Sequence, residues 1–204
     1  MPEDQKAPRE SESAALDGRR QRTQRSRERL LDAVESALRE ADSFKPESIA
    51  TRAGVSLSTL FRQFGDREGL WAAMRARVSS RVEPFLLDRS FAGDTTARIR
   101  QLVDRHAAAF AELAPFRRAA LRLPSRSPAD DDAHAQLSAA LRAQLHAALG
   151  PELEAPHRAS TTALVEALLS YESWEQLRFA QQLDPERVSA LLERGVHALL
   201  AYDA

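Results

Sequence analysis

The 204-residue chain contains no cysteine, and this absence removes several kinds of site at once. Disulfide bonds, thiolate metal ligands and cysteine nucleophiles are excluded, and a reducing compartment is the simplest environment for such a chain. Long apolar runs are missing too, since no stretch approaches the roughly 20 residues that cross a bilayer. The N-terminus is too polar for a secretory signal. We therefore expect a cytoplasmic protein with no membrane partner.

Glycine is scarce as well, with 7 residues, while alanine, leucine, arginine and glutamate are abundant. Strand-rich sequences use more β-branched residues and more turn glycines, so this composition predicts an all-α fold. The patterns GxSxG, HExxH, GxGxxG and the Walker sequence do not occur in the chain. We expect neither an enzyme nor a bound cofactor.

Charge of one sign does not dominate the chain, whose formal net charge is −1, but the charges are unevenly distributed. Residues 19–67 carry 11 basic and 7 acidic groups, a formal charge of +4. The segments before and after them carry −3 and −2. A modest positive region of this kind suits contact with a nucleic acid.

Residues 46–70, PESIATRAGVSLSTLFRQFGDREGL, lie in the positive region and hold two short apolar helical patterns that meet at Gly54. Glycine adopts the left-handed conformation that follows a helix end without the Cβ penalty. Ser56 is expected to cap the second helix by accepting from a backbone N–H two or three residues on. Leu60 and Phe64 share one face and are expected in the core. This pattern is typical of a helix-turn-helix.

A glycine-centred helix pair alone occurs in many all-α proteins. The run AGVSLSTLFRQFGDREGL, however, resembles the DNA-binding signature of the TetR family of transcriptional regulators, whose typical form is close to AGVSxGTLYxHFxSKExL. The positions that match outright are Ala53, Gly54, Val55, Ser56, Thr59, Leu60, Phe64 and Leu70. The departures are Ser58 for glycine, Phe61 for tyrosine, Gln63 for histidine and Arg67 for lysine.

In that family the tyrosine, histidine and lysine tend to hold DNA phosphates. Gln63 and Arg67 keep hydrogen-bond donors at these positions, whereas Phe61 has no hydroxyl to donate. The resemblance implies a double-stranded DNA operator contacted by Lys45, Ser56, Leu57, Ser58, Thr59, Phe61, Arg62, Gln63 and Arg67. Within this set we expect Leu57, Ser58 and Arg62 to read bases, and Lys45, Thr59, Gln63 and Arg67 to contact phosphates.

The chain divides into three expected parts. Residues 1–25 lack apolar periodicity and are predicted to be a disordered, arginine-rich arm. This arm is either a solvated tail or a segment that follows the DNA backbone or enters a minor groove. Residues 26–70 form the helix-turn-helix domain, with a first helix over 26–41. Residues 71–204 form a second helical domain.

Further helices are expected over residues 66–85, from Asp94 onwards, and over 116–123, where Pro115 restarts the chain. Three more are predicted at 129–149, 159–182 and 184–202. TetR-like proteins dimerise through their last two long helices, so the resemblance implies a homodimer on a near-palindromic operator. The apolar stripe of the final helix, with Leu192, Gly195 and Val196, is assigned to that interface.

The second domain also holds the candidates for an effector pocket: Trp71, His106, Phe110, Arg117, Tyr171 and Trp174. Each has a plainer explanation, because aromatic side chains and a lone histidine on an apolar face usually belong to a core. Asp130, Asp131 and Asp132 with His134 could be mistaken for metal ligands. Consecutive acids before a helix more often cap it and meet solvent, so no metal site is expected.

The resemblance implies a repressor that a small-molecule effector releases from its operator. The alternative is a helical DNA-binding protein controlled by a protein partner, with no small-molecule pocket. An enzyme is the third interpretation, and a deep pocket with a convergent acid–base pair would favour it.

Overall fold

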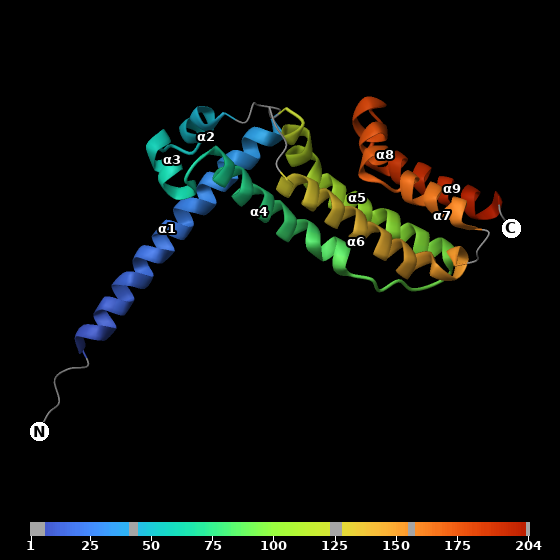
Figure 1. The fold of residues 1–204 in the computed structure, drawn as a ribbon, viewed down its shortest axis with the longest axis horizontal. Coiled ribbons are helices and arrows are strands. Elements are labelled where there is room, and N and C mark those ends of the chain that lie inside the picture. The colour runs from blue at the N-terminus through green and yellow to red at the C-terminus, as the bar shows by residue number, and fades with distance from the viewer. Residues whose placement is uncertain (1–6, 41–44, 123–127, 155–157, 203–204) are drawn as a thin grey trace, which may run out of the picture. The chain divides into compact units, whose positions relative to one another are not determined.

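The computed structural model describes residues 7–40, 45–122, 128–154 and 158–202, with side chains from residue 21 onwards. All regular elements in this part of the chain are helices, which confirms the predicted all-α fold (Figure 1). They are α1 (Ala7–Arg39), α2 (Pro46–Arg52), α3 (Leu57–Phe64), α4 (Arg67–Leu87), α5 (Thr95–Ala120), α6 (Pro128–Leu153), α7 (Ala159–Leu168), α8 (Tyr171–Glu175), the π-helix η2 (Gln176–Ala180) and α9 (Pro185–Tyr202). None of these helices is both long and apolar enough to cross a bilayer.

The chain forms two compact units, residues 1–76 and 77–204. The first unit has an apolar core to which α1, α2, α3 and the start of α4 all contribute. Its buried side chains include Leu30, Leu31, Val34, Leu38, Ile49, Leu60, Phe64, Leu70, Trp71 and Met74. At the surface of this unit, Arg52 of α2 forms an ion pair with Glu40, with 2.8 Å between Nη1 and Oε1.

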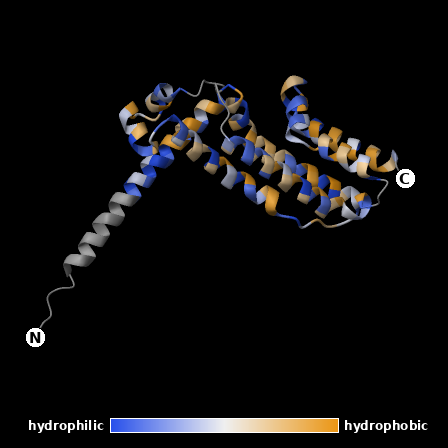
Figure 2. Ribbon diagram, viewed as in Figure 1, coloured by the Kyte–Doolittle hydropathy of each residue, from blue (hydrophilic) through white to orange (hydrophobic). Residues whose placement is uncertain are grey.

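Helix α1 begins at Ala7, much earlier than the expected start at Ser26. The prediction of a disordered arm therefore differs from the structure over residues 7–25. Periodicity was the wrong guide here, because this segment is rich in alanine, arginine, glutamate and glutamine, which favour a helix even without an apolar stripe. The part of α1 that Figure 2 colours is hydrophilic at its start, from residue 21, and apolar colour appears only further along the helix.

Aspartate caps start three of the helices where the sequence predicts them. The Asp66 carboxylate accepts from the N–H of Gly69 at 2.8 Å, ahead of α4. Asp94 accepts from Ala97 at 2.8 Å ahead of α5, and Asp184 accepts from the N–H of Arg187 at 2.8 Å ahead of α9. Each cap satisfies a backbone donor that has no partner inside its own helix.

The second unit is built around one large core to which α5 to α9 contribute. Its buried members include Ile99, Leu102, Val103, Phe110, Leu145, Leu149, Val165, Tyr171, Trp174, Val188, Leu192 and Val196. Leu192 and Val196 are 2% and 0% exposed within a single chain. Their assignment to a dimer interface is therefore wrong. Gly195 marks a close approach of α9 to α7, since a Cβ there would lie 2.7 Å from a methyl carbon of Leu168.

Proline does not end α5, contrary to the prediction of a separate helix after Pro115. A proline inside a helix removes one hydrogen bond and costs about 3 kcal/mol. Its neighbours Ala114 and Phe116 are 3% and 7% exposed, so burial on both sides of Pro115 holds the helix together. The helix predicted to end at residue 149 likewise continues to Leu153 as part of α6, with a kink at Leu149, where φ is −128° and ψ is 16°.

The helix predicted over residues 159–182 is broken instead. Helix α7 ends at Leu168, and Ser170 starts α8 by accepting from the N–H of Ser173 at 3.2 Å. Helix α8 then widens into η2, and the chain leaves it through Gln182 at a φ of 56°. Serine competes well for cap positions, so a serine after a buried leucine can end a helix whose apolar pattern continues.

Candidate nucleic-acid interface

The turn between α2 and α3 has the geometry that its sequence predicts. Gly54 has a φ of +67°. The N–H of Gly54 donates to the Thr51 carbonyl at 3.1 Å, and the N–H of Val55 donates to the Ala50 carbonyl at 2.9 Å. These two bonds make a Schellman ending, which needs a left-handed residue after the helix and satisfies carbonyls that α2 leaves over. The angle at which α3 leaves α2 is therefore fixed by the backbone.

Ser56 caps α3, as predicted. Its Oγ accepts from the N–H of Thr59 at 3.2 Å. The same oxygen lies 2.9 Å from the Ser58 hydroxyl and 3.0 Å from the Thr59 hydroxyl. Three hydroxyls thus form one network at the positive end of the α3 dipole. Ser56 holds the network together, so its role is to position Ser58 and Thr59.

Helix α3 has one buried and one outward face. Leu60 and Phe64 are 0% and 8% exposed and join the core of the first unit. Ser58 and Arg62 are exposed, while the partly exposed members of the predicted set are Leu57, Thr59, Phe61 and Gln63. The division between anchoring and outward side chains agrees with the spacing argument. The outward face of this eight-residue helix is the candidate recognition surface.

Arg27 of α1 fixes the other end of α3, and sequence reasoning gave it no such role. Its Nη1 donates to the carbonyl of Gln63 at 2.9 Å, and its guanidinium lies 4.5 Å from the centre of the Phe64 ring. A cation is favoured at a helix C-terminus, where the last carbonyls lack partners. The signal was present, because Arg27 precedes Leu30, Leu31 and Val34 at helical spacing and so continues the buried stripe of α1.

Two further candidates for phosphate contact lie outside α3, in the same unit. Lys45 is exposed and occupies the position before α2, where its side chain makes no capping bond. Arg67 is exposed and is the first residue of α4, directly after the capping residue Asp66. All nine predicted contact residues therefore belong to the first unit, and each keeps at least part of its side chain accessible.

The effector candidates form a chain of aromatic contacts in the second unit. Phe110 lies 5.7 Å from His106, 5.6 Å from Tyr171 and 5.7 Å from Trp174, measured between ring centroids. Trp174 continues the chain to Phe179 at 5.8 Å. The first four of these rings are between 1% and 4% exposed. Trp71 is also buried but belongs to the first unit.

His106 is the buried titratable group of this cluster. Burial lowers its pKa to about 4, because the charged imidazolium is disfavoured away from water. The Leu169 backbone and the Gln144 side chain lie near enough to offset a small part of this effect. Even so, neither nitrogen of the His106 ring forms a hydrogen bond to any residue that the structure describes. The Gln144 amide nitrogen donates to the Phe85 and Asp88 carbonyls instead, each at 2.7 Å.

Arg117 links the aromatic cluster to α6. Its guanidinium lies 4.3 Å from the centre of the Tyr171 ring, and its Nη2 lies 3.0 Å from the Glu172 carboxylate and 3.2 Å from Nδ1 of His134. His134 therefore faces a cation. Among the described residues no three histidine, aspartate or glutamate side chains gather as metal ligands would.

Comparison with known proteins shows which solved structures share this fold. No protein-family model and no curated protein matches the chain. A transcriptional regulator from Rhodococcus sp. Rha1 is similar in structure, with a TM-score of 0.61 and 20% identity over 86% of this chain and 96% of that one. A protein from Mesorhizobium loti MAFF303099, assigned to the TetR family of transcriptional regulators, has a TM-score of 0.53 and 17% identity over 89% and 98%. The chain has the all-α fold of these regulators.

Proposed function

We propose that the chain is a sequence-specific DNA-binding regulator of transcription, most simply a repressor, and that α3 reads the major groove. The observation that carries this proposal is the two-faced geometry of α3. Leu60 and Phe64 anchor the helix in the core, while Ser58 and Arg62 are exposed on its other side. The Ser56 cap and the Arg27 contact hold its two ends. A short helix fixed at both ends can present polar side chains to base edges with little loss of conformational entropy.

The outward residues divide by chemistry into base-reading and backbone-holding groups. The Arg62 guanidinium suits bidentate pairing with guanine, which is worth about 1 to 3 kcal/mol of discrimination. Leu57 can make only apolar contact, for example with a thymine methyl group, and Ser58 can donate or accept. Thr59, Gln63, Lys45 and Arg67 suit phosphates, which position the protein without reading sequence.

A titration of duplex DNA separates these two roles. We expect Arg62→Ala to narrow the gap in affinity between a duplex selected by the wild-type protein and a scrambled duplex of equal length. Arg67→Ala is expected to weaken both duplexes alike and to lower the salt dependence of binding. Arg142→Ala, on the surface of the second unit, is a control for the loss of one positive charge. Equal loss on both duplexes for Arg62→Ala would contradict the assignment of Arg62.

The regulator is proposed to act as a homodimer on a near-palindromic operator with half-sites about 34 Å apart or a multiple of that distance. Because Leu192 and Val196 belong to the core of one chain, the interface requires other apolar groups of the last helices. Leu164 on α7 is 55% exposed, and Leu191 and Leu199 on α9 are half-buried. We expect Leu164→Glu to shift the sedimenting species towards monomer, and Leu87→Glu, at a residue 62% exposed on α4, to leave it unchanged.

The second unit is proposed to sense either a small molecule or a protein partner. The close packing of Phe110, Tyr171 and Trp174 favours a partner-controlled regulator without a pocket, whereas the polar groups of His106 and Gln144 within that core favour a ligand. An effector that lowers the affinity of the protein for its operator must itself bind the operator-bound protein more weakly than the free protein. The two affinities change by the same factor, typically about 5 to 150. A ligand whose dissociation constant is the same with and without operator is not the regulator.

A further inference from the structure

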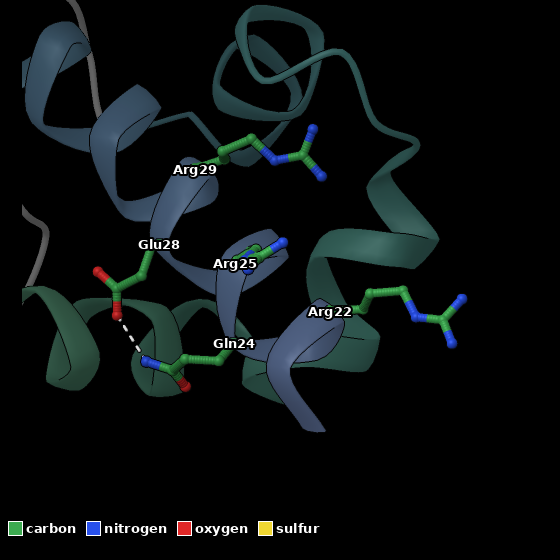
Figure 3. Close-up of a pocket in the computed structure, with 5 residues that line it drawn as sticks. All are labelled: Arg22, Gln24, Arg25, Glu28 and Arg29. Atoms are coloured by element: carbon green, nitrogen blue, oxygen red, sulfur yellow. Dashed lines mark hydrogen bonds between the residues drawn. The ribbon is translucent and has the colours of Figure 1, made fainter. Parts of the chain in front are cut away.

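Three arginines form a stripe on α1, ahead of the segment that packs in the core. Arg22, Arg25 and Arg29 are exposed and follow one another at spacings of three and four residues, so they lie on one side of the helix. With Gln24 and Glu28 they line an open depression on the surface (Figure 3). None of the three belongs to the contact set that the helix-turn-helix signature implies.

The acid that lines this depression, Glu28, is hydrogen-bonded to Gln24. The amide nitrogen of Gln24 donates to the Glu28 carboxylate at 2.7 Å, and in Figure 3 these two side chains extend away from the guanidinium groups of Arg22 and Arg29. The lining of the depression thus carries three guanidinium groups and one carboxylate, an excess of positive charge. A surface that gathers three guanidinium groups within two helical turns suits an anion with several regularly spaced charges.

The spacing of the stripe fits a nucleic-acid backbone. At 1.5 Å per residue, Arg22 and Arg29 are about 10 Å apart along the helix axis. One strand of double-stranded DNA carries a phosphate for every 3.4 Å of its axis, so this length covers about three phosphates. The flexible side chains of arginine can adapt to the remaining differences in position.

The stripe is also held in register with the recognition helix. Arg27 lies among the three arginines in sequence but points to the core side of α1, where it bonds to the Gln63 carbonyl and stacks on Phe64. Gln63 and Phe64 are the last two residues of α3. Through Arg27, the part of α1 that carries Arg25 and Arg29 is therefore connected to the end of α3 within the same compact unit.

We propose that Arg22, Arg25 and Arg29 bind phosphates of double-stranded DNA next to the base pairs that α3 reads. This inference rests on the proposed function and adds to it a second, sequence-independent contact made by a helix. The stripe contributes affinity and salt dependence, while discrimination between sequences stays with α3.

The salt dependence of DNA binding tests this proposal in the full chain. Affinity for a random 30-base-pair duplex and for a duplex selected by the wild-type protein is measured over a range of salt concentrations. The variant Arg22→Ala/Arg25→Ala/Arg29→Ala is expected to lower the slope of log K against log salt by about 0.9 for each phosphate that it no longer neutralises, or about 2 to 3 in total. The ratio of the two affinities is expected to stay unchanged.

Two matched variants accompany this measurement. Lysines at the same three positions keep the charges and are expected to keep most of the slope. The variant Arg89→Ala/Arg100→Ala/Arg142→Ala removes three exposed arginines from the second unit and is expected to leave the slope unchanged. Circular dichroism checks that all variants keep their helices.

The proposal is overturned if the alanine variant of the stripe keeps the wild-type slope, or if the second-unit variant lowers it equally. In both cases a loss of discrimination in Arg62→Ala would leave the proposed function standing. A wild-type protein that does not bind either duplex would overturn both. Loss of binding to vesicles of anionic lipid, with DNA binding intact, would assign the stripe to a membrane surface instead.

Discussion

The two units of the molecule differ in where their candidate functional residues lie. In the first unit, Ser58 and Arg62 are exposed, and separate residues such as Leu60 anchor the helix that carries them. In the second unit, Phe110, Tyr171 and Trp174 are at once the candidate sensor residues and part of the core. Function and stability can therefore be changed separately in the first unit, whereas in the second unit they are tied to the same side chains.

The largest expected loss of stability comes from removing one ring of the aromatic cluster. Trp174→Ala should lower the free energy of unfolding by about 3 to 5 kcal/mol, because the ring is 4% exposed and its removal leaves a cavity. Denaturant titration followed by circular dichroism measures the loss, with Trp174→Phe as the milder companion. A loss below about 1 kcal/mol would mean that the ring lines open space, and the contrast between the units would weaken.

Acid should destabilise the second unit through His106. Its pKa is about 4 in the folded chain and 6.5 as the ordinary value, so the unfolded chain takes up the proton first as the pH falls. The contribution of His106 to the free energy of unfolding is constant above about pH 6.5. As the pH falls from there towards 4, the free energy of unfolding decreases by about 3 kcal/mol in total. In His106→Gln this part of the pH dependence should disappear from unfolding titrations. His146→Gln, at an exposed position on α6, should retain it.

Loss of a helix cap should lower the free energy of unfolding by the same amount in the two units, because a cap acts only on the backbone of its own helix. Ser56→Ala removes the acceptor for the Thr59 N–H in the first unit, and Asp94→Ala removes the acceptor for the Ala97 N–H in the second. Each should cost about 1 kcal/mol of unfolding free energy. Glycine at either position should cost only a few tenths of a kcal/mol. A much larger loss for one cap would show that its residue does more than satisfy the backbone.

The smallest effect is expected from a surface ion pair. Arg142 on α6 meets Glu166 on α7 at 2.9 Å, with side chains 58% and 27% exposed. Exposed pairs of this kind contribute about 0 to 1 kcal/mol, since water screens them and both side chains lose freedom. Arg142→Ala should therefore leave both the unfolding free energy and DNA binding close to wild type. Its near neutrality also validates its use as a charge control.

Local signals predicted the features of the first unit on which the proposed DNA contact depends. Gly54, Ser56 and Asp66 act through backbone bonds within a few residues of themselves, so their types and spacing were sufficient. The same holds for Asp94 and Asp184 in the second unit. The outward face of α3 followed from the positions of Leu60 and Phe64 alone.

Features that depend on distant packing were missed. Helix α5 passes through Pro115 because its neighbours are buried by other helices, and no local pattern reports that burial. Leu192 and Val196 are buried against other helices of the second unit, and the stripe of α9 alone does not show whether its partner is the same chain or a second copy. The contact of Arg27 with Gln63 joins residues 36 positions apart. The length of α1 was missed for the opposite reason, since the helix propensity of its first residues outweighs their lack of an apolar stripe.

Selection from a random pool of DNA fragments tests most directly whether α3 of the first unit reads DNA sequence. Fragments bound by the wild-type protein and by Arg62→Ala would be sequenced after the same number of rounds. We predict a near-palindromic motif for the wild-type protein, and for the variant the same motif with its preference relaxed at one position in each half-site. No enriched motif, or one that Arg62→Ala leaves unchanged at every position, would contradict the claim.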